Sequence, residues 1–174
     1  MGKIHIPEKV NLVIGLIFND IEQCRRVIKN LVKKFGRIDF ESDTLGFNKT
    51  DYYKEEMGGP LKRKFLSFKY TIDLKDIYKI KLDTNLLEKR FSKSGRRTVN
   101  IDPGYLNLSK LVLFSTKDYF HRIYLNKGIY AEVTLFYRDK TFSPLAWTYP
   151  DYKSGSYINI FNSVRQIYKE KISC

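Results

Sequence analysis

The order of apolar and polar positions divides the first part of the chain into a strand, a helix and a second strand. Residues 10–18, "VNLVIGLIF", form an unbroken apolar run of strand length, which is typical of a central strand in a covered sheet. Asn19 and Asp20 follow as residues that cap helices, and Gly36 is a typical helix end. The segment "RIDFES" then resumes as a strand. Between cap and stop, apolar residues recur at helical spacing: Ile21, Cys24, Ile28, Leu31 and Phe35.

A second segment repeats this plan. "KFLSFKYTI" is another central strand candidate, Asp73 is the expected helix cap, "SKSGRR" breaks the helical pattern and "TVNID" resumes as a strand. Two such units predict a ferredoxin-like split βαβ core, in which both helices cover one face of an antiparallel sheet and leave the other face open. The second helix is indicated by apolar spacing at Leu74, Ile77, Ile80, Thr84, Leu87 and Phe91.

Residues 109–143 extend the predicted sheet. "KLVLFST" is a strand, and "HRIYLNKGIYAEVTLFY" is typical of a β-hairpin whose three-residue loop ends in Gly128. An amphipathic helix follows over residues 154–172, with one apolar face. We therefore predict a single α+β domain over residues 1–174, with the two strand-helix-strand units in 1–108.

The hairpin can be paired by counting outward from its loop, which sets Arg122 opposite Glu132 and His121 opposite Val133. The polar face is either a solvated sheet surface or a binding platform, on which tyrosine rings stack and Arg122 binds phosphate. His121 falls on the apolar side, so we expect a buried, hydrogen-bonded histidine unless a bulge at 118–120 reverses the faces. The apolar face is Ile123, Leu125, Ala131 and Val133, and the polar face is Arg122, Tyr124, Tyr130, Glu132, Thr134 and Arg138.

Net charge sharpens the hypothesis of a binding platform. Thirty-two Lys and Arg against nineteen Asp and Glu give a formal charge of +13 and a pI near 9.6. Such a basic protein attracts polyanions, namely nucleic acid, nucleotides or an anionic membrane. We expect it to bind RNA or another phosphate-bearing ligand on the open sheet face. The candidate ligand-binding residues are Arg122, Tyr124, Tyr130 and Glu132 as the platform, Lys62, Arg63, Lys64, Lys110 and Lys117 for phosphates, and Tyr52, Tyr53, Trp147 and Tyr149 as aromatic contacts.

Two other classes of function stay open. An enzyme acting on a nucleotide or phosphoester would bring together Asp118, His121, Arg122 and Glu132, with Mg²⁺ as a candidate cofactor between carboxylate and phosphate. A protein-interaction module, whose basic surface serves solubility, is the third alternative. With two histidines, the chain excludes a polyhistidine metal site, and we predict no resident metal centre. The remaining candidate acids are Asp51, Asp102 and Asp151, of which Asp102 opens the tight-turn signal Asp102-Pro103-Gly104-Tyr105.

Location can also be predicted from the pattern. No apolar run approaches the ~20 residues of a membrane span, and the opening "MGKIHIPEKV" lacks the apolar centre of a signal peptide. We therefore expect a cytoplasmic protein. Cys24 and Cys174 alone suggest neither a disulfide framework nor a zinc site.

Several of these stretches occur in combination in one known family. The segments "VIGLIF", "TDYY", "KRKFLSF", "NIDPGYLNLSKLVLFSTKDYFHRIYL", "GIYAEVTL" and "WTYPDY" resemble a bacterial family called domain of unknown function 4416, across nearly the whole chain. The resemblance implies membership and carries no activity or catalytic residues across. A GTP-binding label is sometimes attached to such members, but this chain has no Gly-rich loop ending in Gly-Lys-Ser/Thr.

Overall fold

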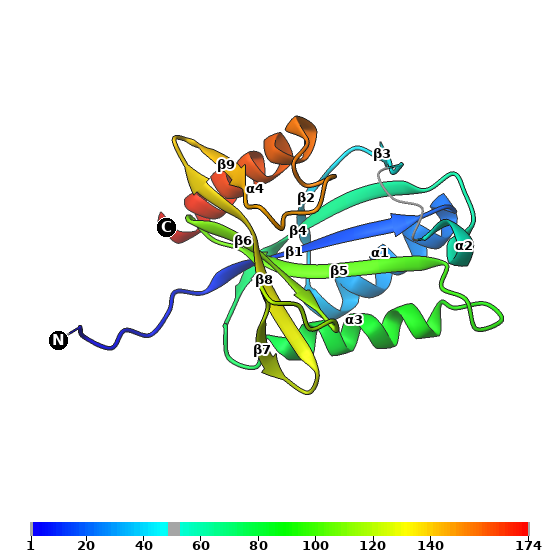
Figure 1. Ribbon diagram of the computed structural model, residues 1–174, viewed down its shortest axis with the longest axis horizontal. Coiled ribbons are helices and arrows are strands. Elements are labelled where there is room, and N and C mark those ends of the chain that lie inside the picture. Colours follow the sequence, from blue (N-terminus) through cyan, green and yellow to red (C-terminus); the bar gives the residue numbers. More distant parts are fainter. Residues whose placement is uncertain (1, 49–52, 174) are drawn as a thin grey trace.

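The fold is an α+β arrangement built on one open antiparallel sheet (Figure 1). The computed structural model describes residues 2–48 and 53–173. Within these residues, nine strands pair in the order β2-β4-β1-β5-β6-β8-β7, with β3 added on β4 and β9 on β8. The strands are β1 (Val10–Phe18), β2 (Ile38–Glu41), β3 (Leu45–Gly46), β4 (Lys62–Ile72), β5 (Val99–Leu106), β6 (Lys110–Ser115), β7 (Ile123–Asn126), β8 (Ile129–Arg138) and β9 (Thr141–Pro144). The helices are α1 (Ile21–Phe35), α2 (Lys54–Met57), α3 (Tyr78–Arg90) and α4 (Gly155–Ser173).

Helices α1 and α3 cover the same face of the sheet, as predicted (Figure 1). The predicted ends of α1 are confirmed. The carboxylate of Asp20 accepts a hydrogen bond from the backbone N–H of Glu22 at 2.8 Å, and Gly36 ends the helix at a φ of 94°. The apolar core beneath these helices comes from alternate positions of the strands, including Leu12, Ile14, Leu16, Phe18, Leu66, Phe68, Val99 and Ile101.

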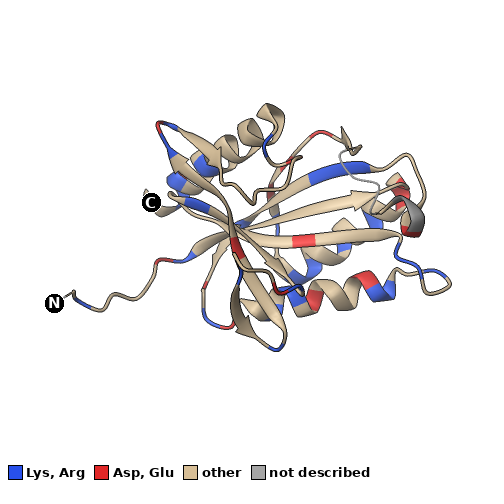
Figure 2. Cartoon of the chain, viewed as in Figure 1, with Lys and Arg blue, Asp and Glu red and all other residues tan. Residues whose placement is uncertain are grey.

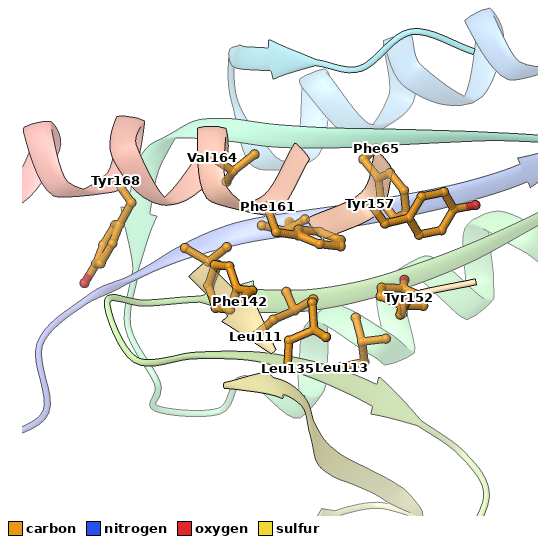
Figure 3. Close-up of a cluster of buried hydrophobic side chains, with 12 residues drawn as sticks. Phe65, Leu111, Leu113, Leu135, Phe142, Tyr152, Tyr157, Phe161, Val164 and Tyr168 are labelled. Atoms are coloured by element: carbon orange, nitrogen blue, oxygen red, sulfur yellow. The ribbon is translucent and has the colours of Figure 1, made fainter. Parts of the chain in front are cut away.

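The opposite face is only partly open, because α4 packs on it (Figure 3). The predicted C-terminal helix is confirmed to within one residue at each end. Its Tyr157 and Phe161 meet the ring of Phe65 on β4 edge-on, with centroid distances of 4.7 and 5.0 Å. Aromatic packing of this kind stabilises a core beyond simple burial. The second face, which the two core helices leave open, is thus covered in part by the C-terminal helix.

Both predicted strand-helix-strand units are present, and their strands are neighbours in the order β2-β4-β1-β5. The predicted start of the second helix is wrong. Asp73 does not cap it, since α3 begins at Tyr78 after Ile77 and has no side-chain cap. Residues 75–77 form a turn instead, and Asp76 adopts a φ of 58°. A backbone in that left-handed conformation delays the helix.

The tight turn predicted at Asp102-Pro103-Gly104-Tyr105 is also wrong, because these residues lie inside β5. Pro103 pairs with Ile14 of β1, and the edge of β5 that faces away from β1 has no strand partner at this point. A proline nitrogen on that edge leaves no ladder hydrogen bond unmade. Gly104 is required for another reason. A Cβ there would lie 2.2 Å from the carbonyl oxygen of Val112 on β6.

The predicted pairing of the hairpin strands is confirmed. Its loop is shorter than predicted, and the buried and exposed faces differ from those expected. Tyr124 pairs with Tyr130, as the count predicted, but the loop has two residues, Lys127 and Gly128, both with positive φ. Such a pair matches the twist of a two-residue hairpin turn. Ile123, expected on a buried apolar face, is instead exposed, whereas Glu132 and Thr134 of the expected open face are buried.

Candidate functional site

A pocket of about 630 Å³ opens where β5 and β6 separate. These strands pair only over Gly104–Leu106 of β5, so the preceding part of β5 diverges from β6. Strands β1 and β4 form the floor of the pocket, and α3 lies at the gap between β5 and β6. Residues 149–152, which follow β9 in the chain, form one wall. The residues that carry chemistry here are Tyr53, Arg63, Lys81, Asn85, Glu88, Arg97, Asn100, Asp102, Ser115, Thr116, Lys117, Tyr149, Asp151 and Tyr152.

Two side chains of α3 take the place of the missing strand along β5. The ammonium group of Lys81 donates to the carbonyl oxygen of Ile101 at 2.9 Å, and the N–H of Ile101 donates to Oε1 of Glu88 at 2.6 Å. Lys81 and Glu88 lie two turns apart on one helix face. Burial raises the pKa of Glu88, and the neighbouring charge of Lys81 opposes that rise. The unpaired edge of β5 is thus satisfied by side chains that also face the pocket.

Arg63 forms the floor of the pocket and is only 1% exposed. Its Nη1 donates to Oδ2 of Asp102 at 3.1 Å, its Nη2 donates to the hydroxyl of Tyr152, and its guanidinium lies 4.8 Å from the ring centroid of Phe65. Asp102 stands on β5 and Arg63 on β4, with β1 between them. The sequence hypothesis that Arg63 is a surface contact for phosphate is therefore corrected. It is a buried cation that links two strands.

Asn100 presents a polar group that the described residues leave unsatisfied. Nη1 of Arg97 donates to Oδ1 of Asn100 at 2.9 Å, and Arg97 is itself held by Glu56, with an Nη2–Oε2 distance of 2.6 Å. This contact fixes the orientation of the Asn100 amide. Its Nδ2 is buried and has no hydrogen-bond partner among the described residues. A buried donor of this kind is costly unless something accepts from it.

Asp102 is the carboxylate around which the pocket tyrosines gather. Burial raises the pKa of Tyr53, and the charge of Asp102 adds to the rise. Burial likewise raises the pKa of Tyr149, with Glu132 and Asp102 contributing. Arg63 binds Oδ2 of Asp102, and the side chain of Asp102 is 27% exposed and lines the pocket. The pocket therefore holds an unpartnered amide donor at Asn100 and a partly exposed carboxylate at Asp102.

A second buried cluster, centred on Arg122, stands behind the wall of the pocket. Nε of Arg122 donates to Oε2 of Glu132 at 2.7 Å, Nη1 donates to the Ser115 hydroxyl and the Lys117 carbonyl, each at 2.9 Å, and Nη2 donates to the Tyr149 hydroxyl at 2.6 Å. The Arg122 side chain is 1% exposed. Its expected place on an open platform is wrong, since the cluster uses its hydrogen bonds to position Ser115, Lys117 and Tyr149.

The chain can now be placed among known proteins. A family model described as Domain of unknown function (DUF4416) matches residues 8–168. The chain belongs to this family. No curated protein and no solved structure matches it.

Three of the four side chains expected to converge in an enzyme do so in this DUF4416 chain. Nε2 of His121 lies 3.1 Å from Oε2 of Glu132, which also binds Arg122. Asp118 does not join this group. It is exposed and lies near Tyr130, whose pKa is raised by desolvation and by the Asp118 charge. His121 is largely buried and stacks on Trp147 at 5.4 Å. The expected hydrogen bond of a largely buried histidine is present, but it is made to Glu132 of the polar face and not on the apolar side, and Nδ1 is buried without a partner among the described residues.

The remaining sequence candidates of the DUF4416 chain are divided between the pocket and other places. Lys117, Tyr53 and Tyr149 line the pocket together with Arg63. Three others do not line the pocket. The Nε1–H of Trp147 donates a hydrogen bond to the carbonyl oxygen of Val133, the ring of Tyr124 packs on that of Tyr130, and Lys64 forms an ion pair with Glu41. Lys62 and Lys110 are half-buried on β4 and β6. Tyr52 and Asp51 lie outside the described residues.

Sequence reasoning missed Lys81, Asn85, Glu88, Arg97 and Asn100. The signal for three of them was present, because Lys81, Asn85 and Glu88 form a polar stripe at helical spacing beside the apolar stripe of α3. Within the described residues, no group of three or more His, Cys, Asp or Glu side chains is arranged to hold a metal ion. In the same part of the chain, no helix is both long and apolar enough to cross a membrane.

Proposed function

We propose that the pocket between β5 and β6 binds a small phosphate-bearing ligand of nucleotide size. The observation that carries this proposal is the buried Nδ2 of Asn100, which has no partner among the described residues. Lys81 stands in the same pocket and uses one of its three ammonium protons on Ile101. Phosphate oxygens accept hydrogen bonds from amide and ammonium donors, and charged acceptors make the stronger bonds.

The size and aromatic lining of the pocket agree with such a ligand. Its volume of about 630 Å³ lies within the ~300–1,000 Å³ that small-molecule sites occupy. Phe47, Tyr53 and Tyr149 supply rings on which a planar base could stack. The partly exposed carboxylate of Asp102 suits a hydroxyl or amino group of the ligand. A ribonucleotide offers all three features, namely phosphate, planar ring and hydroxyl donors.

The test is a thermal-shift panel with inorganic phosphate and ribonucleoside mono- and triphosphates, each with and without Mg²⁺. A ligand that binds only the folded chain raises the melting temperature as its concentration passes Kd. Asn100→Asp keeps an oxygen for Arg97 and replaces the open donor with a negative acceptor, so it should abolish the shift. Asn159→Asp, on the exposed side of α4, makes the same charge change away from the pocket. Equal shifts in both variants, or none in the parent protein, would contradict the proposal.

A catalytic role is the second candidate, and the buried acids of the pocket favour it. Burial raises the pKa of Asp151, against the opposing charge of Arg63, and burial also raises that of Glu88. Carboxyls with raised pKa values serve as general acids near neutral pH. Asp102 would be the carboxylate beside a phosphate-bound Mg²⁺. Incubation of the protein with the ligands that give a thermal shift, followed by chromatography of the products, tests for turnover.

RNA remains a further candidate for the phosphate-bearing ligand because of the +13 charge. Lys and Arg are spread over β4, α3 and α4 instead of gathering on one element (Figure 2). An RNA chain would then contact a broad basic surface and place one nucleotide in the pocket. At the level of topology, we propose that β1-α1-β2 and β4-α3-β5 form a ferredoxin-like core. The neighbouring order β2-β4-β1-β5 with antiparallel pairing supports this.

A further inference from the structure

Residues 2–9 form an arm that stands apart from the rest of the fold. They form neither a helix nor a strand, all of them are exposed, and they run outward from the start of β1 (Figure 1). Ile4 is fully exposed and Ile6 is 92% exposed, and they alternate with the polar residues Lys3 and His5. Apolar residues at every second position are typical of a strand with one buried face. The arm therefore has the pattern of a strand, but it pairs with no strand of the described residues.

Strand β7 offers a free edge. It ends one side of the sheet within the described residues, so its backbone groups that face away from β8 meet no further strand. A free edge is a template for pairing with another chain unless charged residues or proline protect it. The β7 sequence "IYLN" contains neither. At the opposite side of the sheet, β2 is protected by Asp39 and Glu41, two charges in a strand of four residues. Of these two edges, β7 is the one that can accept an added strand.

Ile123 stands where the apolar face of the sheet reaches this edge. It pairs with Ala131, so their side chains share a face. Ala131 and Leu125 pack against the core around Ile129, whereas Ile123 is 73% exposed. A β-bulge in the second half of β7 leaves the regular part of the edge around Ile123. A strand added there, with isoleucine at alternate positions, would cover Ile123 and extend this core.

We propose that the arm of one chain adds as a strand to β7 of a second copy, with Ile4 and Ile6 on the face of Ile123. Within one chain the arm and β7 stand apart (Figure 1). In strand addition, main-chain hydrogen bonds provide affinity and alternate side chains provide specificity. Two copies related by a twofold axis would exchange arms reciprocally, so both free edges are paired and the assembly closes as a dimer. This inference is independent of the ligand of the pocket.

Sedimentation velocity of the full chain at rising concentration tests for the dimer. We expect a reversible dimer, because two exchanged arms form an interface at the small end of the range for protein pairs. Ile6→Asp and Ile123→Asp should each raise the dimer dissociation constant by at least about tenfold, since each would bury a carboxylate against an apolar face. The matched control is Leu86→Asp on α3, where a large apolar side chain is 64% exposed, and it should dimerise as the parent protein does. Melting temperatures measured in parallel show whether each variant folds.

Disulfide trapping identifies the strand that the arm joins. Ile6→Cys and Ile123→Cys are prepared as separate proteins, each with Cys174→Ser, while Cys24 is buried and stays. Under mild oxidation, the mixture should form a cross-linked dimer that neither protein forms alone. A chain that carries both substitutions should cross-link between copies instead of within itself.

Three outcomes would overturn the proposal. One is a parent protein that stays monomeric at every concentration. Another is a dimer that Ile6→Asp and Ile123→Asp leave unchanged, which would place the interface elsewhere. The third is a cross-link within the chain that carries both cysteine substitutions, with no dimer from the mixture, which would show that the arm folds onto its own β7.

Discussion

Arg63 lies directly against Gly15, and the missing side chain of Gly15 is what gives the guanidinium its place. A Cβ on Gly15 would stand 2.8 Å from Nη2 of Arg63 and 3.2 Å from a ring carbon of Phe65. Gly15 pairs with Asp102 across the β1–β5 ladder. An arginine of β4 therefore passes over the central strand to reach a carboxylate of β5, and the floor of the pocket depends on this crossing.

The first prediction concerns Gly15→Ala. The added methyl group must displace Arg63 or Phe65 in a packed core, so we expect a loss of about 1–3 kcal/mol in the free energy of unfolding. Urea denaturation measures it. The control is Gly46→Ala in β3, where a Cβ would meet no heavy atom within 4 Å. Both changes reduce the freedom of the unfolded chain alike, so Gly46→Ala should be neutral or stabilising. Equal stability of the two variants would contradict the crossing.

Local signals predicted those parts of the fold that local interactions determine. The Asp20 cap and the Gly36 stop of α1 involve neighbours within a few residues in the chain, and both are confirmed. The pairing of Tyr124 with Tyr130 followed from the position of the hairpin loop. The turn at Asp102-Pro103-Gly104-Tyr105 failed because contacts with β1 and β6, distant in sequence, hold the segment extended.

The candidate site was harder to predict, for the same physical reason. Arg63 stands in a basic run, and nothing near it in the chain shows that Gly15 leaves space for it in the core. Arg122 and Glu132 were correctly placed opposite each other, but their burial comes from the later segment that carries Tyr149. The role of Lys81 and Glu88 could not be predicted, because it depends on β6 diverging from β5. This divergence leaves the backbone of Ile101 free to bond both side chains.

The second prediction is that Arg122→Ala is strongly destabilising. The substitution leaves Glu132 buried without its main cation, because the two side chains are 1% and 2% exposed. Removing one partner of a buried pair costs about 3–5 kcal/mol. Chemical denaturation measures the change. Arg138→Ala is the control, since Arg138 pairs with Asp139 on the surface and should cost less than about 1 kcal/mol. A cost for Arg122→Ala no larger than that of the control would show that the cluster adds nothing to stability.

The third prediction is a pH dependence that originates at Glu88. Burial raises its pKa above the ordinary value of 4.5. Between that value and the raised one, the folded chain holds a proton that the unfolded chain has released. The free energy of unfolding therefore falls as the pH rises through this window. Glu88→Gln removes the titration and keeps an oxygen for the N–H of Ile101.

We expect the difference in unfolding free energy between Glu88→Gln and the parent protein to shift in favour of the variant from about pH 4 to pH 8. It should level off once Glu88 is ionised in both states. Glu22→Gln on the exposed side of α1 makes the same chemical change outside the core and serves as the control. Stability curves of Glu88→Gln and the parent that stay parallel across this range would contradict the assignment.

The last prediction separates RNA from a free nucleotide as the ligand. If a broad basic surface holds single-stranded RNA, six phosphate contacts give a slope of log K against log salt of about −4 to −5. If the pocket also takes one nucleotide of that RNA, Asn100→Asp should weaken binding at every salt concentration and leave the slope nearly unchanged, because the phosphates bound by surface lysines stay the same. Fluorescence anisotropy of a labelled oligonucleotide measures both the affinity and its salt slope. An excess of mononucleotide should weaken binding of the oligonucleotide to the parent protein and not to the variant. If the parent protein does not bind the oligonucleotide even at low salt, RNA is rejected as the ligand. A thermal shift with mononucleotides under the same conditions would then leave the pocket as a site for a small phosphate-bearing molecule.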